Sequence, residues 1–76
     1  INTYVIEAFN KIAKEQYHFT NDEIIQAVNN LKLNKSLPGT YNEIISQYPD
    51  NVLIQLFMIK YNCDEKDAYE KIKTSK

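Results

Sequence analysis

The chain has 76 residues, and its nine basic and ten acidic side chains give a formal net charge of −1 at pH 7. A hydrophobic content of 43 % with a single glycine excludes a disordered chain and argues against a turn-rich all-β protein. All nine basic residues are lysines, which disfavours nucleic acid as a partner, because arginine is the side chain best suited to bidentate contacts with phosphate and guanine.

The first predicted element is a helix over residues Thr3–Tyr17. Its apolar residues recur at spacings of three and four, which is the pattern of a helix with one face on a core. Polar residues, among them Glu7 and Lys11, occupy the opposite face. The expected inward set is Val5, Ala8, Phe9, Ile12 and Ala13.

A second helix is predicted after Thr20 and is expected to run to about Lys32. Thr20 and Glu23 have the spacing of a capping box, in which each side chain serves the backbone N–H of the other residue. Phe19 and Ile24 stand at the two positions of a hydrophobic staple. The expected inward set is Ile24, Ile25, Val28 and Leu31, and a loop over residues 34–39 follows.

Thr40 and Glu43 repeat the capping box and predict a short third helix that reaches about Tyr48. Pro49 is expected to end this helix, because proline has no backbone N–H to donate. Its predicted apolar stripe is Tyr41, Ile44, Ile45 and Tyr48.

The most apolar stretch of the chain runs from Asn51 to Tyr61, where Gln55 and Lys60 are the only polar side chains after Asn51. Its flanks favour a helix over a buried strand, because Pro49 and then Asp50 supply a break and an N-cap carboxylate. A helix that is apolar on nearly all sides must be buried on most of them. We therefore expect this segment to be the central helix of the domain.

A last helix is predicted after Asp64, with residues 62–63 as a brief link. Acidic residues in its first turn and lysines near its end complement the helix dipole. Its expected inward set is Ala68, Tyr69 and Ile72.

Together these elements predict an all-α fold, a compact four- to five-helix orthogonal bundle around a buried central helix at about residues 51–61. Residues 1–76 are expected to form one domain, since the chain is short and contains no linker-like segment. The lack of a signal peptide or an apolar run of membrane-spanning length predicts a cytoplasmic protein that does not insert into a membrane.

No group of residues predicts a catalytic site, a metal site or a bound cofactor. His18 is the only histidine, and no nucleophile or orienting partner accompanies it in the sequence. Cys63 is the only cysteine, so the chain cannot form an internal disulfide or a cysteine-based metal cluster. Helix-start chemistry explains the acidic cluster of Asp64, Glu65 and Asp67.

The function expected from this pattern is a small intracellular, non-enzymatic protein–protein interaction or regulatory module that binds another protein or itself as a homodimer. Tyr17, Leu37 and Tyr41 are the predicted partner-binding residues, because they place apolar side chains at irregular backbone. The alternative is a weak DNA-binding regulator of helix-turn-helix type. It would use the helix over residues 41–48, where Asn42, Ser46 and Gln47 could reach base edges.

Overall fold

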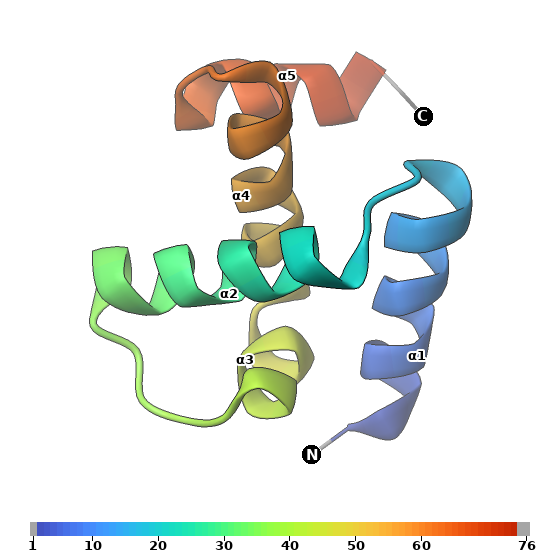
Figure 1. The fold of residues 1–76 in the computed structure, drawn as a ribbon, viewed down its shortest axis with the longest axis vertical. Coiled ribbons are helices and arrows are strands. Elements are labelled where there is room, and N and C mark those ends of the chain that lie inside the picture. Colours follow the sequence, from blue (N-terminus) through green and yellow to red (C-terminus); the bar gives the residue numbers. More distant parts are fainter. Residues whose placement is uncertain (1, 75–76) are drawn as a thin grey trace.

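The computed structural model describes residues 2–74, which form five α-helices and no strand. The helices are α1 (Thr3–Lys11), α2 (Asn21–Lys35), α3 (Tyr41–Gln47), α4 (Pro49–Tyr61) and α5 (Glu65–Thr74). A π-helical turn, Ile12–Gln16, extends α1. Figure 1 shows α2 and α5 crossing α4 at two heights, with α1 and α3 beside them. The predicted all-α bundle is therefore confirmed.

Helix α4 is the centre of the core. It packs against α1, α2, α3 and α5, most extensively against α2 and α5. Its buried side chains include Val52, Leu56 and Phe57, and the polar Gln55 is buried among them. The predicted central helix is confirmed, and no helix in residues 2–74 has the length and apolar character needed to cross a membrane.

Both predicted capping boxes are present. Thr20 Oγ1 accepts from the Glu23 N–H at 3.2 Å, and Glu23 Oε1 accepts from the Thr20 N–H at 2.8 Å. Thr40 and Glu43 make the same reciprocal pair at 3.3 Å and 3.2 Å. The bond from the Thr40 N–H is the main reason that the pKa of Glu43 lies below its usual value, so the carboxylate stays ionised and keeps its capping role.

The caps lead to a direct prediction. We expect Thr20→Ala and Thr40→Ala each to lower the free energy of unfolding by about 0.5–2 kcal/mol, because each leaves one N–H at a helix start without its partner. Urea denaturation measures both values. Asn21→Ala is a matched control, because this exposed residue lies beside Thr20 and makes no capping bond of its own in the structure. Equal stability of the two threonine variants and wild type would contradict the prediction.

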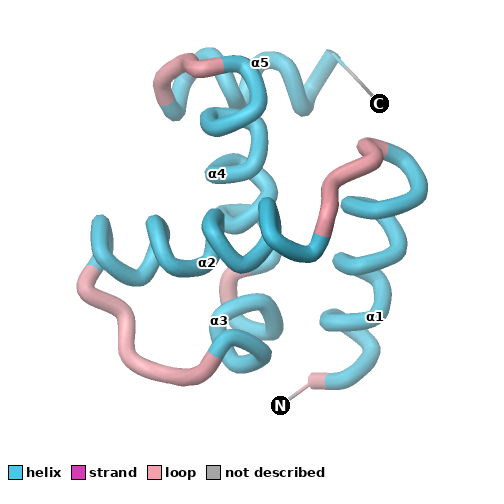
Figure 2. The backbone as a smooth tube through the Cα atoms, in the orientation of Figure 1, coloured by secondary structure: helices cyan, strands magenta, loops and turns pink. Residues whose placement is uncertain are grey.

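Three of the predicted helix boundaries differ from those of the structure. The first α-helix ends at Lys11, and its continuation to Gln16 is π-helical. Helix α2 continues past Lys32 to Lys35 and ends where Ser36 adopts a left-handed conformation, with φ of 53°. The loop is therefore residues 36–40 rather than 34–39. Figure 2 shows it as the longest connection between helices.

The start of α4 also differs from the prediction. Tyr48 is the residue that precedes the helix, Pro49 is its first residue and Asp50 its second. Proline fits the first helical turn, because the N–H that it lacks has no partner there in any helix. Asp50 is therefore not the N-cap, although its carboxylate still lies at the positive end of the helix dipole. Pro49 begins α4 after Gln47 has ended α3.

Several side chains predicted to face inward are exposed. Ile25 of α2 and Tyr69 of α5 are each about half exposed, at 45 % and 51 %. Ala8 and Ile12 of the first helix are also exposed, whereas Phe9 and Ala13 are buried as predicted. The buried stripe of each of these helices is thus narrower than the apolar pattern in the sequence.

Candidate interaction surface

Helix α1 carries apolar side chains on two faces. The inner face contacts the core through Ile6, Phe9 and Ala13. The other face, called here the outer face of α1, consists of Tyr4, Ala8 and Ile12, which follow one another at four-residue intervals. Side chains at this spacing lie above one another on one side of a helix. All three are exposed, Tyr4 at 85 % and Ile12 at 43 %.

Beside the outer face of α1 lies a hollow of about 220 Å³ between α1 and the start of α4. Its walls are almost entirely apolar. They are formed by Val5, Ala8, Phe9, Ile12, Pro49, Asp50 and Leu53. Ala8 and Ile12 therefore belong both to the outer face of α1 and to this hollow.

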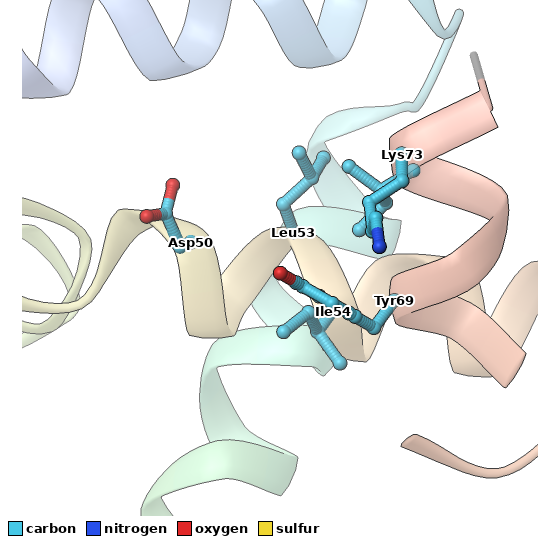
Figure 3. A pocket seen from close by; sticks show the side chains of 6 residues that line it. Asp50, Leu53, Ile54, Tyr69 and Lys73 are labelled. Carbon is cyan, nitrogen blue, oxygen red and sulfur yellow. The ribbon is translucent and has the colours of Figure 1, made fainter. Parts of the chain in front are cut away.

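A second hollow of about 220 Å³ lies on the other side of Leu53, between α4 and α5. Its lining residues are Asp50, Leu53, Ile54, Tyr69, Ile72 and Lys73. Figure 3 shows Tyr69 and Lys73 of α5 close to Leu53 and Ile54 of α4, with Asp50 at one end. The two hollows share Asp50 and Leu53, so they are neighbours along α4, and together they are called here the α4 groove.

The charges of the α4 groove are few. Asp50 supplies one carboxylate at the start of α4, and Lys73 supplies one ammonium group, whose Nζ lies 5.5 Å from the centre of the Tyr69 ring. Neither histidine nor cysteine lines the groove. Apolar walls with two isolated charges suit the docking of an apolar side chain or a helix.

The three residues predicted to bind a partner lie elsewhere and are not brought together in one exposed patch. Tyr17, Leu37 and Tyr41 are each half-buried and pack against the core. The Tyr17 ring meets Phe57 edge-on, with ring centres 5.0 Å apart. Burial raises the pKa of the Tyr41 hydroxyl. Their role in binding stays a prediction, and each of them also has a packing role.

The remaining candidates from the sequence occupy links and helix ends. His18 is exposed, and its φ of 60° lets the chain turn from the π-helical segment toward α2. Cys63 is half-buried and packs against the core, with its Sγ 4.0 Å from the Phe57 carbonyl oxygen. Asp64 caps α5 by accepting from the Asp67 N–H at 2.9 Å, as predicted. Residues 2–74 contain no cluster of potential metal ligands.

The residues of the DNA-binding alternative lie on α3. Asn42 and Gln47 are exposed, but Ser46 is half-buried, and its Oγ accepts from the Asn2 N–H at 3.0 Å. That bond ties α3 to the start of α1 and engages one of the three side chains that would have to reach a base. Helix α3 is also only seven residues long.

The sequence-based prediction gives Tyr4 no role, although its side chain is exposed. The sequence pattern that could have identified it is the series Tyr4, Ala8 and Ile12 at four-residue intervals, which forms a second apolar stripe beside the inward one. Leu33 of α2 has similar exposure, at 80 %, but it lines neither of the two hollows of the α4 groove.

Comparison with known proteins adds no relative: the chain matches no protein-family model, no curated protein and no solved structure.

Proposed function

We propose that the domain is a small, non-enzymatic protein–protein interaction module that binds a second copy of itself through the outer face of α1. The observation that carries this proposal is the row of exposed apolar side chains Tyr4, Ala8 and Ile12, of which Tyr4 is exposed at 85 % and the other two also line the α4 groove. Contiguous exposed apolar surface on a small soluble domain marks an interaction site. A large aromatic ring at its edge is a typical interface anchor.

The small net charge of the chain is compatible with a second copy as the partner. Its formal net charge is −1, so two copies repel each other only weakly. The α1 contact surface is small, because nine helical residues span only about 14 Å. Stable complexes usually bury about 800 Å² on each partner. We therefore expect a weak, concentration-dependent dimer.

The test is sedimentation equilibrium of the chain at concentrations up to about 1 mM, where an interaction of only a few kcal/mol becomes visible. We expect wild type to dimerise and Tyr4→Gln to weaken the dimer at least about tenfold, because an anchoring tyrosine typically contributes 2 kcal/mol or more. Circular dichroism should be unchanged, since Tyr4 is mostly exposed.

Leu33→Gln is the matched control, because it removes an equally exposed apolar side chain from a different helix without changing the charge. This variant should dimerise like wild type. A monomeric wild type at about 1 mM would overturn the proposal. Equal weakening by Tyr4→Gln and Leu33→Gln would show that exposed apolar area in general, rather than α1, drives the association.

A further inference from the structure

We infer that the two copies pair through antiparallel α1 helices, with Glu7 of each copy facing Lys11 of the other; this inference rests on the proposed function. Glu7 and Lys11 are both exposed residues of α1. Each precedes a member of the outer face by one position, Glu7 before Ala8 and Lys11 before Ile12. The two charges therefore lie along the same flank of the apolar stripe.

Symmetry then decides between the two possible directions of pairing. In a two-fold dimer of parallel helices, each flank meets the opposite flank of the partner, so Glu7 and Lys11 would lie beside the apolar flank that carries Val5 and would form no pair with each other. In an antiparallel pair, the same flanks meet, and the order along one helix is reversed. An antiparallel pair centred on Ala8 brings Glu7 of one copy to the level of Lys11 of the other, within about two residues or 3 Å along the axis. The two Glu7 side chains have the same offset, so this flank holds two pairs of opposite charge and one pair of like charge.

The apolar residues fit the same arrangement. With Ala8 facing Ala8 at the centre, Tyr4 of one copy stands level with Ile12 of the other, twice by symmetry. A small side chain at the centre allows close approach of the two backbones. On the flank opposite the charges, Ile12 of the second copy reaches Val5, which lines the hollow between α1 and α4. The contact thus has an apolar centre, one apolar flank and one charged flank.

The opposite charges also give α1 its preference for a second copy over an arbitrary apolar partner. Its acid and its base are placed so that the helix complements itself when reversed. Exposed ion pairs contribute modestly to affinity, but only the antiparallel arrangement brings Glu7 and Lys11 of the two copies together. Variants that change these charges therefore test the direction of pairing.

The first test is a charge exchange followed by sedimentation equilibrium. Glu7→Lys and Lys11→Glu should each weaken the dimer about 2- to 30-fold, because each breaks two symmetry-related ion pairs and places like charges together. The double variant Glu7→Lys/Lys11→Glu should restore the wild-type dissociation constant to within about threefold, the range left by small changes within the helix. Helical circular dichroism of each variant controls for folding.

The second test reads the direction of pairing by disulfide formation, with Cys63→Ala in every chain. One chain carries Tyr4→Cys, and a second chain with a size tag carries Ile12→Cys. Helices packed about 8–10 Å apart bring facing Cα atoms into the range of a disulfide, about 4.4–6.8 Å. We expect the mixed product to dominate under mild oxidation, because only antiparallel pairing puts position 4 beside position 12.

The outcomes separate this inference from the proposed function. A wild-type dimer that is lost in Tyr4→Gln, with no rescue by the double charge variant, would overturn antiparallel pairing and leave the function in place. Dominant crosslinks between two copies of position 4 would do the same. A monomeric wild type would overturn both.

Discussion

Phe57→Ala should lower the free energy of unfolding by about 3–5 kcal/mol, because the removed ring leaves a cavity in the part of the core where three other rings meet. Phe57 is only 2 % exposed. Its ring centre lies 5.0 Å from that of Tyr17, 5.9 Å from Phe19 and 5.7 Å from Tyr61. Phe57 is therefore the central ring of this aromatic cluster, in contact with each of the other three.

The measurement is urea denaturation followed by circular dichroism. A domain of this size is expected to have a total stability of about 4–11 kcal/mol, so the variant should lose a large share of it. Phe57→Leu is the conservative control, because it retains an apolar side chain that fills part of the space, and it should cost clearly less. A loss below about 1 kcal/mol for Phe57→Ala, the scale of a surface substitution, would show that the aromatic cluster is not part of the stabilising core.

Those parts of the fold that depend on local chemistry could be predicted from the sequence. A capping box involves residues only three apart, so it predicts a helix start independently of the rest of the fold. Both helix starts could be predicted in this way, from Thr20 with Glu23 and from Thr40 with Glu43. The uninterrupted apolar stretch after Asn51 likewise predicts burial on several sides, since no neighbouring polar stripe is available to face water.

The width of each buried stripe could not be predicted, because it depends on which other helices cover it. Helix α2 buries Ile24, Ala27, Val28 and Leu31, a narrow stripe at spacings of three and four. Ile25 lies one position to the side, beyond the reach of the neighbouring helices, and is exposed. Tyr69 is placed in the same way beside Ala68. Ala27, missing from the predicted inward set, has the better spacing.

The outer face of α1 could not be predicted for the same reason. Ala8 and Ile12 fit the inward pattern of the first helix as well as Phe9 and Ala13 do. Only the packing of α1 on α3 and α4 shows that Phe9 and Ala13 are buried while Ala8 and Ile12 are exposed. The α4 groove brings residues of the first helix, which is distant in sequence, beside residues of α4 and α5. A sequence pattern within one helix cannot predict which residues of other helices lie beside it. The π-helical turn, Ile12–Gln16, likewise has no recognisable sequence signal.

The second large loss of stability is expected in helix α3. This helix is too short to be stable alone, so its contacts with other helices must hold it in place. It has seven residues, and isolated helices shorter than about 12–15 residues are marginal in water. Its two buried side chains are Ile44 and Ile45, and the helix packs against α1, α2 and α4. The attachment of α3 therefore depends largely on these two isoleucines.

We expect Ile45→Ala to lower the free energy of unfolding by about 2–5 kcal/mol, because its side chain is fully buried and the surrounding helices can close the resulting cavity only in part. Asn42→Ala, an exposed change on the same helix, should stay within about 0.5 kcal/mol of wild type. Urea denaturation measures both. Hydrogen exchange adds a local readout: the amides of α3 should lose protection in Ile45→Ala before those of α4 do, because a helix held by fewer contacts opens at a lower free energy. Protection lost equally in α3 and α4 would mean that α3 opens only when the whole domain unfolds, and it would contradict the view of α3 as a separately attached helix.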